Sequence, residues 1–258
     1  MTISSYALFA TIGLCVAVLF IFLRSEQVGL DFKSIVLYII TCFVCGAIVA
    51  RLVFVIAMIP SMNPLSIDMI IHYLINGGIV FYGGLIGVII GIIIVSKMRK
   101  VDVMNMLDFI TPAFPLFHFF ARIGCIFAGC CYGIPCSWGV VMQGETIVRF
   151  PVQFFESLCN LLIFVWLEIF NRKTKSNKHN FAIYMCSYAV CRFGLEFFRG
   201  DTVRGIWNIG LSTSQCISLL IIFTYTGIFF KNRINARFTL NKKTKHEFEM
   251  ADGGDKIS

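Results

Sequence analysis

The chain has 258 residues, of which 58% are hydrophobic, 15% aromatic and only 14% charged. An ordinary soluble domain carries about 25% charged residues, so this composition excludes a soluble domain, a secreted disulfide scaffold, a nucleic-acid module and a disordered chain. The net charge of +8 resides mainly in the polar connections, and we therefore interpret it as a sign of membrane topology.

Seven apolar blocks are each long enough to cross a bilayer as a helix, which takes about 17–25 residues. We predict an all-α, polytopic integral membrane bundle of about seven transmembrane helices. In chain order the predicted spans are Tyr6–Leu23, Ser34–Ile59, Ile79–Val95, Met104–Cys125, Val152–Phe170, Phe181–Phe198 and Ile206–Phe230. We expect one membrane domain over residues 1–230, with an outer loop at 131–151, and a basic, then acidic cytoplasmic tail at 231–258.

Basic residues alternate between the two sides of the predicted bundle. The segments that follow the first, third, fifth and seventh spans contain 16 Lys or Arg residues, and the three opposite connections contain 3. Loops rich in Lys and Arg stay in the cytoplasm. We therefore expect the N-terminus outside and the C-terminus inside the cell.

Three arginines, Arg51, Arg122 and Arg192, lie inside predicted spans. A charge within the membrane costs several kcal/mol and by default marks a functional site. At about 1.5 Å of rise per residue, all three fall in the outer half of the membrane, as do Glu156 and Glu196. We expect one shared site in the outer leaflet, and separate snorkelling of each side chain is the alternative.

The spacing of these residues supports a shared site. Arg192 and Glu196 are four residues apart, so they lie on one helix face and can pair, and Arg199 continues the stripe. His118 lies one turn before Arg122, just after two prolines that should kink or break the helix. Guanidinium groups bind phosphate through paired hydrogen bonds, which favours a phospholipid of the outer leaflet as the ligand.

Glycines crowd the third predicted span. A row with a spacing of four, which lets another helix approach closely, consists of Gly83, Gly87 and Gly91. Two glycine pairs, at positions 77–78 and 83–84, predict a broken backbone with close contacts around Tyr82.

Eleven cysteines are present, and most lie in apolar spans, where cysteine acts as a small hydrophobic residue. Cys125, Cys130, Cys131 and Cys136 are closer together, but their spacing is not that of paired C-x-x-C metal ligands. We expect no metal and no cofactor.

Ordered motifs along most of the chain resemble the bacterial prolipoprotein diacylglyceryl transferase family. The segment from Arg122 to Gly133 resembles its signature Arg-Ile-Gly-Asn-Phe-x-Asn-Gly-Glu-x-x-Gly, and the segment from Arg192 to Arg199 resembles Arg-Phe-x-x-Glu-Phe-x-Arg. The other matching segments are Tyr6–Leu8, Gly46–Arg51, Asn76–Gly87, Pro151–Glu156 and Ser214–Gln215. The order of the motifs, together with the topology, makes the resemblance specific.

The resemblance implies an enzyme of the bacterial plasma membrane with its active site toward the outer leaflet. It would transfer the diacylglyceryl group from phosphatidylglycerol to the thiol of a lipobox cysteine, forming a thioether and releasing glycerol phosphate. The implied partners are phosphatidylglycerol and prolipoprotein signal peptides that contain this cysteine.

Site residues also follow from the resemblance. Arg122, Arg192 and Arg199 would bind the phosphate, and Arg122 and Arg192 would stabilise its developing charge. Glu196 would orient Arg192. The pocket would be formed by Tyr6, Arg51, Gly83, Gly84, Gly124, Gly129, Gly133, Gln153 and Glu156.

Three positions depart from the family pattern. Tyr82 replaces a histidine, Cys125 an asparagine and Cys130 an acidic residue. A neutral tyrosine is a poor base for a thiol. Three alternatives remain open: guanidinium neighbours lower the pKa of Tyr82 so that it can act as the base, His118 is the base, or the arginines acidify the substrate thiol and no base is needed. The alternative functions are a family relative with an altered substrate, a non-catalytic phospholipid-binding protein and an anion permease.

Overall fold

The computed structural model describes residues 5–59, 66–78, 81–142, 146–174, 179–200 and 210–228, and the side chains of residues 81 and 82 fall outside this description. The predicted tail at 231–258 also lies outside the described residues. The elements are α1 (Ser5–Arg24), the 3-10 helix η1 (Ser25–Val28), α2 (Phe32–Met58), α3 (Ile67–Asn76), α4 (Phe81–Arg99), α5 (Val103–Ile110), α6 (Ala113–Ala128), β1 (Pro135–Val141), β2 (Val148–Arg149), α7 (Val152–Thr174), α8 (Asn180–Glu196) and a final helix, Thr213–Ile228.

The described part of the chain is mostly helical, and several of its helices suit a membrane. Within the described ranges, length and composition allow four segments to cross a bilayer, namely Ser5–Val28, Phe32–Met58, Val103–Ala128 and Val152–Thr174. Many of their apolar side chains are exposed in the isolated chain, such as Leu19 at 57% and Phe43 at 65%. A membrane protein presents such side chains to lipid.

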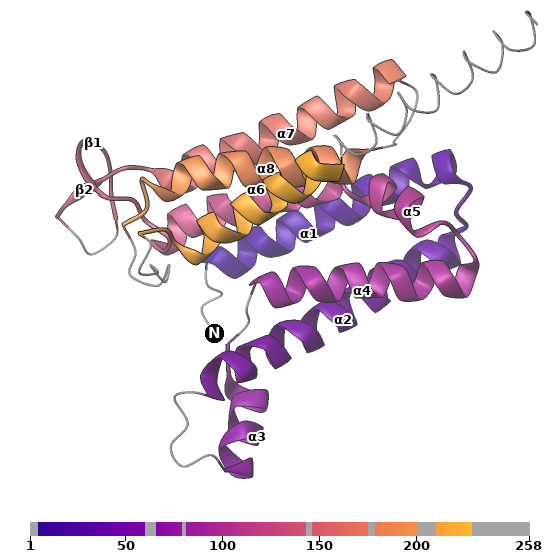
Figure 1. Cartoon of the computed structure of the whole chain (residues 1–258), viewed down its shortest axis with the longest axis horizontal. Coiled ribbons are helices and arrows are strands. Elements are labelled where there is room, and N and C mark those ends of the chain that lie inside the picture. Colours follow the sequence, from indigo (N-terminus) through magenta and orange to yellow (C-terminus); the bar gives the residue numbers. More distant parts are fainter. Residues whose placement is uncertain are drawn as a thin grey trace, which may run out of the picture.

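The helices pack in two groups. Helix α1 packs on α6, α6 on α7 and α7 on α8, whereas α2 packs on α4 (Figure 1). The short helix α5 contacts both α4 and α8 and so joins the groups. One buried apolar cluster, which includes Tyr38, Ile92 and Phe109, links α2, α4 and α5.

The glycine row of α4 faces α2. A Cβ atom on Gly87 would lie 2.3 Å from the carbonyl oxygen of Cys45, and one on Gly83 would lie 2.8 Å from the Cα of Ala50. Only glycine allows backbones this close. The predicted close approach of a second helix is thus confirmed.

The prolines interrupt the fourth predicted span. Helix α5 ends at Ile110 and α6 begins at Ala113, with Thr111 and Pro112 between them. Proline lacks the amide hydrogen that a continuous helix needs, and the predicted break is confirmed. The single span Met104–Cys125 is therefore two helices.

Two predicted connections contain regular structure. The segment between the second and third spans, expected to be a plain connection, carries α3, whose N-cap Ser66 accepts a hydrogen bond from the amide of Met69 at 3.2 Å. The loop at 131–151 contains an antiparallel pair of strands, β1 and β2, in which Val141 pairs with Val148. The described residues are otherwise mostly helical, so this small sheet is an addition to the predicted helical bundle.

One end of the bundle is marked by basic helix ends. Helices α1, α4 and α7 carry basic residues in their last turns: Arg24, Lys97, Arg99, Arg172 and Lys173. Figure 1 places the strands β1 and β2, the start of α7 and the end of α8 at the opposite end. The candidate site lies at this second end.

Candidate active site

A buried network of ion pairs connects α6, α7 and α8. Glu156 in the first turns of α7 accepts from two arginines, with 2.9 Å from its Oε1 to Nη2 of Arg122 and 3.3 Å from its Oε2 to Nη1 of Arg192. Arg192 also pairs with Glu196 at 2.8 Å, and Arg199 lies 3.7 Å from the same carboxylate oxygen. We call these five residues the Glu156 cluster. The pairing of Arg192 with Glu196 predicted from their spacing is confirmed.

The cluster is almost closed to solvent. Glu156 is 2% exposed, Glu196 1% and Arg192 6%. Desolvating charges costs several kcal/mol per ion, and opposite charges and hydrogen bonds must compensate for that cost. The hydroxyl of Tyr188 donates to Glu156 Oε1 at 3.1 Å, and Arg192 Nη2 donates to the hydroxyl oxygen of Ser214 at 3.2 Å.

The charges of the cluster do not cancel. Three guanidinium groups face two carboxylates, which leaves one net positive charge among the described residues. The Nε of Arg122 is buried, and no hydrogen-bond partner for it is found among these residues. A buried donor without a partner is costly, so the cluster is suited to accept an anion.

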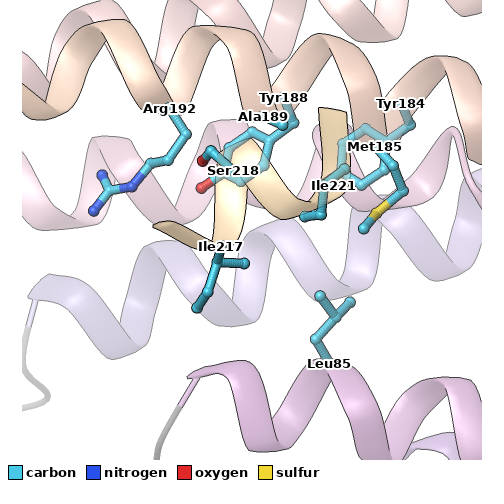
Figure 2. Close-up of a pocket in the computed structure, with 9 residues that line it drawn as sticks. All are labelled: Leu85, Tyr184, Met185, Tyr188, Ala189, Arg192, Ile217, Ser218 and Ile221. Atoms are coloured by element: carbon cyan, nitrogen blue, oxygen red, sulfur yellow. The ribbon is translucent and has the colours of Figure 1, made fainter. Parts of the chain in front are cut away.

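A mostly apolar pocket adjoins the cluster. Figure 2 shows Arg192 and Tyr188 of α8 along its wall, Ile217 and Ile221 of the final helix beside them, and Leu85 of α4 on the opposite side. The guanidinium group of Arg192 lies at one end of the labelled residues (Figure 2). A cationic end joined to an apolar lining suits an amphiphile with an anionic group.

Several predicted pocket residues shape the surroundings of the cluster. Gly124 lies against α1, where an added Cβ would be 3.2 Å from the Cα of Tyr6. Gly133 forms an isolated bridge with Arg199, and a Cβ on it would lie 2.2 Å from the carbonyl oxygen of Phe150. These contacts fix the backbone that carries Arg199.

The end of α6 is shaped by two further predicted residues. Gly129 ends the helix in the left-handed conformation, with φ +67°, which glycine adopts without strain. Gln153 donates from its Nε2 to the carbonyl oxygen of Cys130 at 2.8 Å. The turn after α6 is thereby fastened to the start of α7.

The structure does not bring all predicted residues together. Arg51 donates to the carbonyl oxygen of Gly77 at the end of α3 instead of joining the Glu156 cluster. Gly83 and Gly84 face Ala50 of α2. Among the described residues Arg51 is therefore not in contact with the Glu156 cluster, since α2 packs mainly on α4 and also contacts α3.

Of the two candidate bases, His118 and Tyr82, His118 lies buried next to the cluster. His118 is 4% exposed, and its ring centroid lies 5.2 Å from that of Tyr188. The side chain of Tyr82 lies outside the described residues, although its backbone belongs to the first turn of α4.

The sequence did not predict Tyr188, and it pointed to Ser214 only as part of the motif Ser214–Gln215, without a contact. Tyr188 precedes Arg192 by four residues and so lies on the same face of α8. This spacing could have predicted that Tyr188 is close to the cluster. Ser214 gives no such signal, because it comes from a separate helix that meets α8 only in the folded chain.

The fold and the site define a helical membrane protein that buries a net positive cluster beside an apolar pocket. A family model described as prolipoprotein diacylglyceryl transferase matches residues 1–231. A Clostridium tetani protein named phosphatidylglycerol–prolipoprotein diacylglyceryl transferase is 34% identical over 89% of this chain and 92% of its own length. Another, from Clostridium perfringens and named phosphatidylglycerol–prolipoprotein diacylglyceryl transferase 2, is 28% identical over 93% and 95%. The chain belongs to the prolipoprotein diacylglyceryl transferase family, and it is a transferase.

Proposed function

We propose that this chain transfers the diacylglyceryl group of phosphatidylglycerol to the thiol of a prolipoprotein lipobox cysteine, the first step of lipoprotein maturation. Family membership and the names of the relatives support the reaction. The observation that carries the assignment to a site is the pairing of both Arg122 and Arg192 with Glu156.

The charge of the Glu156 cluster matches the lipid substrate. The phosphodiester of phosphatidylglycerol carries a single negative charge, and the cluster has one net positive charge among the described residues. When the glycerol carbon–oxygen bond breaks, negative charge grows on the departing phosphate. Positioned cationic donors stabilise such charge most strongly in a site that excludes water, so Arg122 and Arg192 are the proposed catalytic groups.

The carboxylates hold these donors in place. Glu156 spans the gap between Arg122 on α6 and Arg192 on α8, and Glu196 holds the other edge of Arg192. Guanidinium groups fixed in advance need no reorganisation during the reaction. Arg199, on the far side of Glu196, is the third proposed phosphate ligand.

The apolar pocket is the proposed site of the lipid tails. Its lining by Leu85, Met185, Ile217 and Ile221 offers hydrocarbon contact beside the guanidinium group of Arg192 (Figure 2). The remaining proposed pocket residues are of two groups. Tyr6, Gly124, Gly129, Gly133 and Gln153 surround the ends of α6 and α7 near the cluster, and Arg51, Gly83 and Gly84 lie where α2 packs on α4.

Tyr82 and His118 are the two candidates for deprotonating the peptide thiol. Tyr82, at the start of α4, is the proposed residue at the position of the family histidine. The imidazole of His118 is enclosed beside Tyr188, which supports a role in packing the cluster more than proton exchange with a peptide.

We propose seven spans, with the N-terminus outside, the C-terminus in the cytoplasm and the active site toward the outer leaflet. Support comes from the basic last turns of α1, α4 and α7, which lie at the end of the bundle opposite the Glu156 cluster. Basic ends favour the cytoplasm. Residues 1–230 then form the membrane domain and residues 231–258 a cytoplasmic tail.

A transfer assay tests the proposal. The purified chain in phosphatidylglycerol vesicles should attach diacylglyceryl to a lipobox peptide, detected as a mass increase, and Arg122→Ala should abolish this. Arg24→Ala is the matched control, since it removes a guanidinium group that pairs with Glu168 at 2.6 Å at the other end of the bundle. Unchanged turnover in Arg122→Ala would overturn the assignment.

The same assay separates the alternative functions. Tight phosphatidylglycerol binding without thioether formation would indicate a non-catalytic lipid-binding protein. Flux of a phosphorylated solute across the vesicle membrane would indicate a permease.

A further inference from the structure

Three thiols meet at the end of α6. Cys125 lies in the last turn of the helix, and Cys130 and Cys131 follow its C-terminus. The Sγ atoms of all three lie within 4.8 Å of one another. Their spacing in the sequence does not suggest this, so the expectation based on spacing misses the cluster.

The backbone explains how the thiols meet. Gly129 has φ +67° and Cys131 has φ +58°, two left-handed residues that turn the chain back toward the helix. A left-handed conformation costs a non-glycine residue free energy, so the fold holds Cys131 in this position against its local preference. Gln153 fastens the same turn through the carbonyl oxygen of Cys130.

This geometry is that of a thiolate metal site. Zn–S bonds of about 2.3 Å place tetrahedral thiolates about 3.8 Å apart, within the 4.8 Å limit observed here. Catalytic zinc sites use three protein ligands and keep a fourth position open. The three cysteines supply that number.

The surroundings also suit such a site. Three thiolates and a divalent cation have one net negative charge, and Nη1 of Arg122 lies 4.0 Å from Sγ of Cys125. A cationic donor next to a ligand sulfur is a typical outer partner of a metal site. Through Arg122 the thiols also adjoin the Glu156 cluster.

We propose that Cys125, Cys130 and Cys131 bind a soft d10 cation of the Zn2+ class, whose fourth position accepts the thiol of the peptide substrate. The second half of this statement rests on the proposed transferase function. It assigns a chemical role to Cys125 and Cys130, which depart from the family pattern, and it supplies thiol activation where Tyr82 replaces histidine.

In the proposed transfer step one carbon–sulfur bond forms and one carbon–oxygen bond breaks. A thiol that coordinates such a cation gives its proton to solvent. Its sulfur then forms the carbon–sulfur bond to the glycerol carbon while the carbon–oxygen bond breaks. The electron pair leaves with the phosphate, whose charge Arg122 and Arg192 stabilise, and no redox step is involved.

Metal binding is tested with the full-length protein, reduced and freed of metal by a chelator. Titration with Co2+ should give a thiolate-to-cobalt charge-transfer band that saturates at a single ion per chain, and Zn2+ should displace it. Ser replacements of Cys125, Cys130 or Cys131 should weaken Co2+ binding by more than the roughly 100-fold that outer-shell changes cost. Cys15→Ser, in α1 outside the cluster, is the control and should match the wild type.

A second readout does not depend on the variants folding. Zn2+ should protect Cys125, Cys130 and Cys131 of the wild-type protein from maleimide labelling, while Cys15 remains unprotected. Equal labelling with and without Zn2+, or a disulfide among the three cysteines in the reduced preparation, would overturn the metal site.

The role of the fourth position is tested by adding a lipobox peptide to the Co2+-loaded protein. The charge-transfer band should grow with the cysteine peptide and not with its serine analogue. If the band grows but no transfer to peptide occurs, the metal site stands and the proposed function fails. If metal-free protein transfers at the full rate, the proposed function stands and this inference fails.

Discussion

Two buried charged regions lie at opposite ends of the bundle and differ in what surrounds them. At one end, Asp108 of α5 accepts hydrogen bonds from the amides of His179 and Phe181 at 2.9 and 2.8 Å, and its carbonyl oxygen accepts from Asn180 at 2.9 Å. At the other end, Glu156 faces arginine side chains from two helices.

The partners of the two carboxylates indicate that Asp108 stabilises the fold and that the Glu156 cluster serves a ligand. The carboxylate of Asp108 is used to satisfy the backbone at the start of α8, as a helix cap does. In the Glu156 cluster the partners are themselves charged, and a net positive charge and the unpaired Nε of Arg122 remain among the described residues. A carboxylate whose partners are backbone amides serves the fold, whereas a buried arginine donor without a partner among the described residues, such as Nε of Arg122, is suited to a ligand.

The most severe disruption of the cluster is Glu156→Ala. It leaves Arg122 and Arg192 buried without their shared carboxylate, and loss of one partner of a buried ion pair costs about 3–5 kcal/mol. We expect transfer to fall below detection and the thermal unfolding temperature to drop sharply. Transfer at the wild-type rate in this variant would show that the cluster has no part in the reaction.

Arg192→Lys tests geometry with charge held constant. A lysine cannot hold Glu156 and Glu196 at once, because it lacks the planar fork of a guanidinium. We expect transfer to fall by about 100-fold to 1000-fold, as when a single transition-state donor is removed, with a smaller loss of thermal stability. If kcat and KM both match the wild type, the fork has no role.

Asp108→Asn gives the opposite pattern. One carboxylate oxygen becomes an amide nitrogen facing a backbone amide, and an unsatisfied buried group costs about 1–3 kcal/mol. We expect a lower unfolding temperature with unchanged transfer per folded molecule. Loss of transfer at wild-type stability would break the distinction between the two regions.

Tyr188→Phe is expected to have the smallest effect. It removes one hydrogen bond to the charged carboxylate of Glu156, worth about 1.5–3 kcal/mol, and retains the ring beside His118. A decrease of several-fold in transfer would fit this role. No decrease would limit Tyr188 to packing.

Hydropathy and the positions of the prolines predicted the long helices correctly, but they did not predict the regular structure within the connections. The apolar blocks and the break at Pro112 follow from rules that act within a few residues of the sequence. Helix α3 and the strands β1 and β2 are short, and their signals, such as the N-cap at Ser66, are weak beside the long apolar blocks. The sequence therefore predicted them only as connections.

Residue counting placed Arg122, Arg192 and Glu156 at a common level along the bundle, but it did not give the rotation of their helices. Counting residues along a span gives the height of a side chain, and a spacing of four gives its helix face, which is why the pair of Arg192 and Glu196 was found. Neither gives the direction in which a helix turns its face. The contact of Arg51 with Gly77 and the central place of Glu156 were therefore not predicted.

The central claim is that Arg122 and Arg192 together bind one lipid phosphodiester. The most direct test measures the preference of the purified protein for phosphatidylglycerol over a zwitterionic phospholipid with the same acyl chains. The preference should be lost in both Arg122→Gln and Arg192→Gln and retained in Arg24→Gln. A preference that survives both substitutions would contradict the account.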